Sequence, residues 1–171
     1  AFVSVGWLHR SFIRFDISAL PAVASVAKIR VYCSIPTAAA VIGIHKVTSS
    51  WTETAPIWSS QPTYDPVAAA QYSIPAAPIN APAWPTWFEA DITALYNVWK
   101  SSGTNYGLML KGDESVFDTY HSVMSSESGG ALLPQLVVVD AGDAYTEVSR
   151  SIAPSAGEFA IHYGTGRLRF H

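Results

Sequence analysis

Hydrophobic and polar side chains alternate along several short stretches of this chain, and turn residues separate the stretches. In one of them Ile29, Val31 and Cys33 fall on one face of a strand, and the residues between them fall on the other. Such stretches cover residues 2–5, 11–16, 28–35, 41–47, 86–90, 106–111, 116–120 and 136–139. Short strands with turn residues between them are typical of all-β domains. The pattern therefore predicts an antiparallel β-sandwich in which Cys33 is a small buried hydrophobic residue.

The region after residue 90 predicts a single short helix. The side-chain oxygens of Asp91 and Thr93 can accept hydrogen bonds from the free N–H groups at the start of a helix. Trp99 follows a leucine by four residues on the same helical face, and Gly103 stands where a chain leaves a helix with positive φ. We expect the helix to run from Thr93 or the next residue to about Lys100, with Trp99 buried.

Five segments form an ordered series of motifs. They are RSFIRFDISALP (10–21), WTETAPIWSSQP (51–62), PTWFEADITALYNVWKSSGTNYGLMLKG (85–112), DTYHSVMSSES (118–128) and LLPQLVVVD (132–140). Their order and content resemble the DNRLRE domain, also called the disaggregatase-related repeat, over residues 2–140. That family overlaps a group of carbohydrate-binding modules reported to recognise alginate-like polysaccharide. The resemblance implies a jelly-roll sandwich on an extracellular bacterial, archaeal or phage protein, without shared catalytic residues.

Some residues of these motifs are predicted to support the structure. Turn or capping hydrogen bonds explain the acidic Asp16 and Asp91. Because Trp51 and Trp58 belong to one motif of the family, we expect them to fill the core together. The full structural set is Asp16, Trp51, Trp58, Asp91, Thr93 and Trp99.

Between Ala55 and Trp87 the chain is rich in proline and carries one charged residue. This composition predicts an extended, mostly unpaired excursion with one short strand near residues 71–74. The candidate glycan-binding residues are its rings Tyr64, Tyr72 and Trp84, because flat rings stack on the C–H faces of pyranose sugars. Packing under the loop or at a subunit contact is the alternative for the same rings.

Residues 141–171 lie outside the resemblance and are predicted to form an extension after the module of residues 1–140. Alternation on either side of Gly164-Thr165-Gly166 predicts a β-hairpin. Because an isolated hairpin is marginal in water, its apolar face is expected to contact another copy of the chain or a partner subunit. Packing against its own sandwich is the competing interpretation. The apolar face comprises Phe159, Ile161, Tyr163, Leu168 and Phe170.

Composition and motifs exclude several functions. The net charge is −3 and the ten basic residues are spread thinly, so no basic patch for nucleic acid is expected. No apolar run approaches the roughly 20 residues that span a bilayer. The chain lacks the G-x-S-x-G, H-E-x-x-H and Walker motifs, which predicts that it is not an enzyme.

No cofactor is expected, apart from a structural calcium ion. The candidate ligands are Asp113 and Glu114, in a turn rich in oxygen atoms between two strands. A solvated acidic turn is the alternative for the same two residues. The five histidines lack the spacing of zinc ligands.

Two classes of function remain. The first is a non-catalytic structural module of an extracellular or virion assembly, such as a phage tail, fibre or filament, with homo-oligomer or other subunit contacts. The second is a carbohydrate-binding module that recognises an acidic polysaccharide. We place the assembly first, because a glycan-binding module needs only the body ending near Asp140. Both classes imply a location outside the cell, at the cell surface or on a virion.

Overall fold

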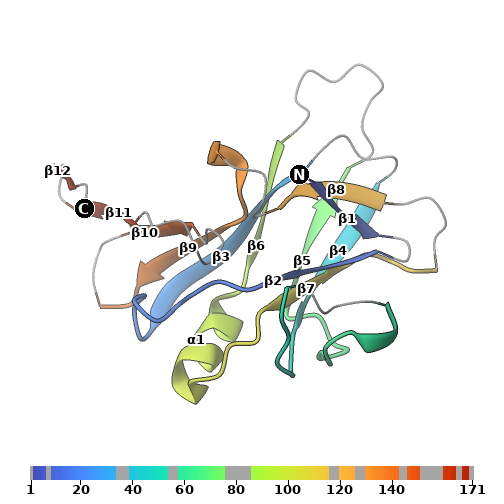
Figure 1. Cartoon of the computed structure of the whole chain (residues 1–171). Helices are drawn as coiled ribbons and strands as arrows, with labels where there is room; N and C mark the ends of the chain where they lie inside the picture. The colour runs from blue at the N-terminus through green and yellow to red at the C-terminus, as the bar shows by residue number, and fades with distance from the viewer. Residues whose placement is uncertain are drawn as a thin grey trace.

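The computed structural model describes residues 2–6, 9–33, 39–53, 58–75, 86–115, 120–125, 130–142, 146–150, 160–164 and 167–169. Within these residues the strands form two antiparallel sheets, and the helix α1 (Thr93–Ser102) lies at one end of them (Figure 1). The predicted all-β sandwich with one short helix is therefore confirmed. The jelly-roll strand order stays a prediction.

The larger sheet contains the long strand β3 (Ala24–Cys33) near its centre. Its order is β1 (Phe2–Gly6), β8 (Tyr120–Met124), β3, β9 (Gln135–Asp140), β10 (Thr146–Arg150), β11 (Ala160–Gly164) and β12 (Arg167–Arg169). A further strand, β6 (Thr86–Asp91), pairs with β3 outside this order. β3 is consequently flanked by β6 and β9, which brings three strands from distant parts of the sequence side by side.

The smaller sheet has the order β2 (Arg10–Ile13), β7 (Leu108–Lys111), β4 (Ala40–Lys46) and β5 (Ala70–Ile74). Strand β5 falls where the proline-rich segment was predicted to hold one short strand. Two single turns of 3-10 helix, η1 (Trp58–Ser60) and η3 (Gly130–Leu132), complete the described elements.

Hydrophobic side chains from the two sheets and from α1 meet in one core. Ile29 and Leu136 come from the larger sheet, Ile42 and Leu110 from the smaller one, and all four are fully buried. Cys33 is also buried, and its burial raises the pKa of the thiol to about 12. A thiol with this pKa stays protonated at neutral pH, which fits a packing role and not a reactive one.

The helix α1 follows the predicted pattern at both ends. The Asp91 carboxylate accepts a hydrogen bond from the Thr93 N–H at 2.8 Å, and the chain leaves the helix at Gly103 with φ of 67°. Thr93 differs from the prediction, because its hydroxyl accepts a hydrogen bond from the Ala27 N–H at 2.8 Å. Thr93 therefore ties the helix to β3 and does not cap it.

One predicted strand is described only at its last residue. Residues 116–120 were expected to be extended; Tyr120 begins the observed strand β8, and residues 116–119 lie outside the described part of the chain. The position of β8 follows from its pairing with β1, in which Met124 lies opposite Phe2 and Tyr120 opposite Gly6. The pattern of residues 116–124 alone does not specify this register.

The C-terminal extension continues the larger sheet. β10 pairs with both β9 and β11, and β11 pairs with β12 as the predicted hairpin. The side chains of Ile161, Tyr163 and Leu168 lie outside the description, as do Phe159 and Phe170 entirely. Contact of this apolar face with a partner therefore stays a prediction, as does the division at residue 140.

Candidate functional site

The three rings predicted to bind glycan do not form one surface in the described residues. Tyr72 is only 5% exposed, and its ring stacks on Phe88 between the sheets, with centroids 5.8 Å apart. Tyr72 is therefore a core residue, as the packing alternative proposed, and it cannot stack on a sugar. Tyr64 is half-buried on the smaller sheet, and Trp84 lies outside the described residues.

The predicted structural residues make local contacts. The Asp16 carboxylate accepts a hydrogen bond from the Ser18 N–H at 2.9 Å, and this bond lowers the pKa of Asp16. The half-buried Trp51 donates its indole N–H to the Tyr106 carbonyl, and Trp99 is 2% exposed in the core. The side chain of Trp58 lies outside the description.

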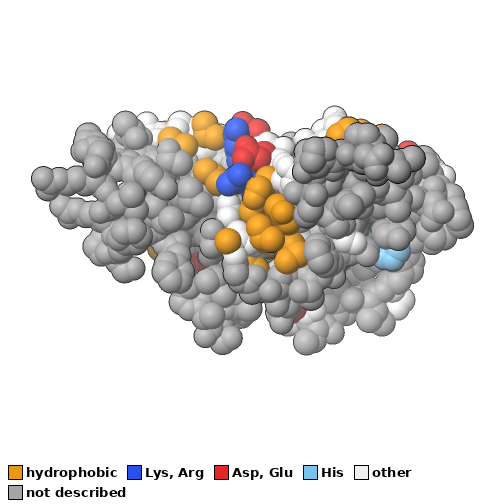
Figure 2. Space-filling model, turned by 90° about the horizontal axis from the view of Figure 1, so that it is seen from above, with side chains coloured by type: hydrophobic (Ala, Val, Ile, Leu, Met, Phe, Trp, Pro, Cys, Tyr) orange, Lys and Arg blue, Asp and Glu red, His pale blue; other side chains and the backbone are white. Residues whose placement is uncertain are grey.

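A flat surface on the outside of the larger sheet brings together aromatic, basic and acidic side chains. We call it the β3–β6 face. Because alternate residues of β3 point into the core, Lys28, Arg30 and Tyr32 point outward. Their neighbours on β6 are Asp91, Glu89 and Trp87 in the same order, and Gln135 of β9 lies beside Arg30. Figure 2 shows charged side chains gathered beside a hydrophobic patch on this side of the molecule.

Arg30 is the centre of this face. Its Nε forms an ion pair with Glu89 at 2.6 Å, and its Nη1 donates a hydrogen bond to the Gln135 side-chain oxygen at 3.0 Å. Its guanidinium also lies 4.9 Å from the centroid of the Trp87 ring. Lys28 approaches Glu89 at 3.5 Å. We call these five residues the Arg30 set; their contacts hold the face in one arrangement.

Tyr32 extends the aromatic part of this face. Its ring meets the Trp87 ring edge-on, with centroids 5.2 Å apart and an interplanar angle of 66°. Both rings are half-buried, so part of each ring surface remains open to solvent. The strand pattern predicts only that Trp87 belongs to a strand and that Tyr32 points away from the core. The pairing of β3 with β6 is what makes them neighbours.

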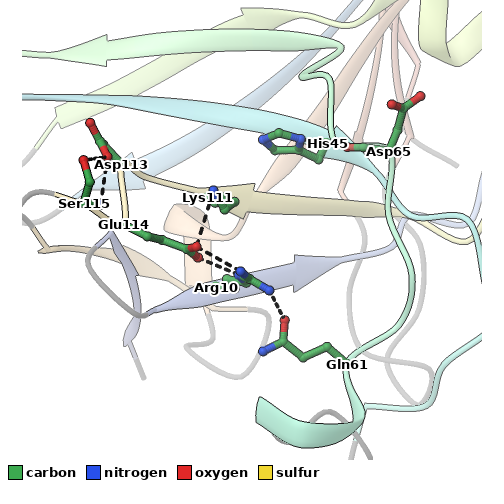
Figure 3. Close-up of polar contacts among 8 residues, drawn as sticks. All are labelled: Arg10, His45, Gln61, Asp65, Lys111, Asp113, Glu114 and Ser115. Atoms are coloured by element: carbon green, nitrogen blue, oxygen red, sulfur yellow. Dashed lines mark hydrogen bonds and ion pairs between the residues drawn. The ribbon is translucent and has the colours of Figure 1, made fainter.

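A second polar cluster lies on the outside of the smaller sheet (Figure 3). Arg10 donates hydrogen bonds to both oxygens of Glu114, at 2.6 and 2.9 Å, and one to Gln61 at 2.7 Å. Its guanidinium lies 5.4 Å from the centroid of the Tyr64 ring, and Lys111 approaches Glu114 at 3.4 Å. We call these five residues the Arg10 set. Their hydrogen bonds raise the pKa of Arg10 and lower the pKa of Glu114.

The two predicted calcium ligands are used in other contacts. Glu114 binds Arg10 and Lys111, whereas Asp113 accepts hydrogen bonds from the N–H and hydroxyl of Ser115 at 2.9 and 2.6 Å. No three His, Cys, Asp or Glu residues of the described chain come close enough together to hold a metal ion. The contacts of Asp113 and Glu114 fit a solvated, hydrogen-bonded turn.

Comparison with known families bears on the two predicted classes of function. Residues 3–140 match the model of carbohydrate-binding module family 96. The chain belongs to this family. The match supports the carbohydrate-binding part of the resemblance found in the sequence, and it does not bear on the DNRLRE name. No curated protein and no solved structure gave a match.

Membership of family 96 favours the second predicted class, a carbohydrate-binding module, over the assembly module that was placed first. Nothing observed supports a virion or filament role. Modules of such families are typically non-catalytic, in agreement with the lack of catalytic motifs. The match ends with β9 at Asp140, so β10, β11 and β12 lie beyond it. In the described residues no helix is long and apolar enough to cross a membrane.

Proposed function

We propose that this chain is a non-catalytic module that binds an acidic polysaccharide on its β3–β6 face, outside the cell. The observation that carries the proposal is the presence of two half-buried rings, Trp87 and Tyr32, beside two basic side chains on one open sheet face. Family membership supports carbohydrate as the ligand, and the side chains of the face support an acidic one.

The rings fit the apolar side of a sugar. A pyranose presents C–H groups on one side, and an aromatic ring with an open surface can cover them and remove apolar area from water. Trp87 is fixed by Arg30 on one side and by Tyr32 on another. A ring held in place before binding loses little conformational entropy when the ligand arrives, which favours affinity.

The charges of the face fit an acidic sugar. Lys28 and Arg30 carry two positive charges beside the carboxylates of Glu89 and Asp91; Glu89 pairs with both basic groups, and the Asp91 carboxylate accepts hydrogen bonds from Thr93. The side chains of Lys28 and Glu89 are 43% and 41% exposed, so their contact is weak and easily exchanged. A ligand carboxylate can therefore pair with Lys28 without displacing a buried charge.

Binding of the purified chain to alginate, polygalacturonate and cellulose, measured by affinity electrophoresis and calorimetry, tests the proposal. We expect Trp87→Ala to weaken binding to an acidic polymer by about tenfold, which corresponds to about 1.4 kcal/mol. Lys28→Ala should weaken it less, and mainly at low salt. Val98→Ala, at an exposed position of α1, is the control and should bind like the parent.

Two results would reject the proposal. One is full binding by a folded Trp87→Ala, Tyr32→Ala double variant, which would place the ligand elsewhere. The other is the failure of the parent chain to bind either acidic polymer. Lys46→Ala serves as the charge-matched control for Lys28→Ala, because Lys46 belongs to neither polar set.

A further inference from the structure

The Arg10 set repeats the chemistry of the Arg30 set on the other sheet. Each set joins one arginine to a glutamate, a glutamine, a lysine and an aromatic ring. The closest Arg–Glu contact is 2.6 Å in both, and the arginine lies 4.9 Å from a ring centroid in one and 5.4 Å in the other. We infer that the Arg10 set forms part of a second polysaccharide-binding site, on the opposite outer face of the sandwich.

The Arg10 set lies at one end of a row of outward positions that crosses the whole smaller sheet. Arg10 pairs with Lys111, Lys111 with Gly43, and Gly43 with Gln71. The alternate positions on these strands, among them Leu110, are buried, so the row faces outward. A chain molecule lying across the strands would meet two basic groups and the exposed amide of Gln71 along this row.

His45 packs beneath the Tyr64 ring on this face. Its Nδ1 lies 2.9 Å from the carbonyl oxygen of Asp65, which can only accept, so Nδ1 carries the proton and the neutral ring keeps a lone pair on Nε2. A Cβ at Gly43 would lie only 2.8 Å from this Nε2. Glycine at position 43 therefore lets the imidazole lie over the sheet, where His45 is only 8% exposed and supports the Tyr64 ring.

A shallow hollow adjoins the row at its β4–β5 end. It measures about 530 Å³ and is lined by residues 39–41 and 73–75 together with Asp113. Its walls are mostly apolar with a few polar groups, and its size is within the range of small-ligand sites. The apolar wall suits the C–H side of a sugar ring. Arg10 and Lys111 both contact Glu114 and are less exposed than Lys28, so this site should recognise hydroxyl groups more than carboxylates.

The two faces point away from each other, because they are the outer sides of two sheets that pack through a common core. One short glycan segment cannot touch both faces. The module would therefore hold two segments at once and could link two polysaccharide chains, with a gain in avidity on a polymer. This inference rests on the proposed function for the class of ligand, but it concerns a different surface.

Calorimetry and native mass spectrometry with an alginate hexasaccharide test the inference. We expect two equivalents to bind the parent chain, and only one to bind with the parent's affinity to either Trp87→Ala or a Lys111→Ala, Gln71→Ala double variant. The variant with all three changes should bind neither equivalent with that affinity. Arg10 stays unchanged in these variants because it holds loops in place. The equivalent that remains in Trp87→Ala should lose less affinity when salt is raised, because the basic side chains of its site are less exposed than Lys28.

The outcomes separate this inference from the proposed function. One equivalent in the parent, weakened about tenfold in Trp87→Ala and unchanged in the double variant, overturns the second site and keeps the proposed face. One equivalent lost only in the double variant overturns both the proposed face and the pair of sites. The melting temperature of each variant, compared with those of the parent and of the control Lys46→Ala, tests whether the variant is folded. As a second readout, only a chain with two sites should increase the viscosity of dilute alginate.

Discussion

The two outer faces of the sandwich carry the same five kinds of side chain in different surroundings. Every member of the Arg30 set lies on a strand, β3, β6 or β9, whose backbone is already held by the sheet. In the Arg10 set, Gln61, Tyr64 and Glu114 lie outside the named strands, so side-chain contacts help to hold their backbone. The side chains of Arg10 and Glu114 are 16% and 21% exposed, against 29% and 41% for Arg30 and Glu89.

This comparison shows that the same set of side-chain contacts can form a binding surface in one place and stabilise the fold in another. Where the backbone is fixed independently, an arginine–glutamate pair beside a ring is free to act as a binding surface. Where the same pair joins loops to a strand, it also stabilises the fold, and a substitution changes both stability and binding. The following changes are arranged from the largest expected effect to the smallest.

A substitution in the core should lower stability more than any substitution on either face. Trp99→Ala should lower the free energy of unfolding by about 3 to 5 kcal/mol, because it leaves a cavity beside fully buried side chains. Denaturant titration measures the change. A midpoint equal to that of the parent would show that Trp99 does not pack as described.

Arg10→Ala and Arg30→Ala form a matched pair that tests the comparison directly. Arg10→Ala should cost about 2 kcal/mol of stability, since it removes three hydrogen bonds between charged or polar groups that fix loops. Arg30→Ala should cost less than about 1 kcal/mol, because its ion pair is more exposed and its strands remain paired. Equal losses in chemical denaturation would remove the distinction between the two faces.

The aromatic rings of the two faces should also differ, one affecting mainly binding and the other mainly stability. Trp87→Ala is expected to leave stability nearly unchanged while weakening glycan binding by about tenfold. Tyr64→Ala should lower the melting temperature, because Tyr64 packs against His45 as well as Arg10. Melting curves and binding isotherms on the same protein samples compare the two. A stable Tyr64→Ala variant would mean that the loop does not depend on this ring.

The contribution of Glu114 to stability should depend on pH. Its hydrogen bonds with Arg10 lower the folded-state pKa below 4.5, so its contribution is present above that value and is lost as the pH falls through the folded pKa. The stability difference between the parent and Glu114→Gln should therefore shrink as the pH is lowered from 6 to 3. A difference that stays constant over this range would contradict the lowered pKa.

Salt should produce the smallest effect. Raising the ionic strength from about 0.05 to 0.15 M shortens the screening length and weakens the attraction between an acidic polymer and Lys28. Affinity for alginate should fall several-fold in the parent and less in Lys28→Ala. Equal salt dependence in both proteins, with Lys46→Ala as control, would exclude Lys28 from the contact.

Local alternation was enough to predict the fold class and most strands. The face of β3 with Ile29 and Val31 could be read from the sequence, because the two-residue period of a strand is a local property. The burial of Tyr72, which was predicted either to bind glycan or to pack, follows from the same period. Gln71, Tyr72, Ser73 and Ile74 alternate, and the buried members are Tyr72 and Ile74.

The two polar sets could not be predicted from local sequence. Arg30 and Gln135 are 105 residues apart, and Arg10 and Glu114 are 104 residues apart. They meet because strands pair in a particular order and register, and the strand pattern alone leaves both open. The strand pattern does predict that Arg30 and Tyr32 point outward on one strand. It does not predict that Glu89 and Trp87 lie beside them, and these neighbours complete the polar and aromatic contacts of the face.

An NMR titration with an alginate hexasaccharide tests the central claim most directly. The chain has six tryptophans, so the indole N–H signal of Trp87 can be assigned by comparison with a Trp87→Phe variant. The account predicts that this signal shifts with the ligand and saturates together with backbone signals of Tyr32 and Arg30. A saturating titration in which the Trp87 signal does not move would contradict binding on the β3–β6 face.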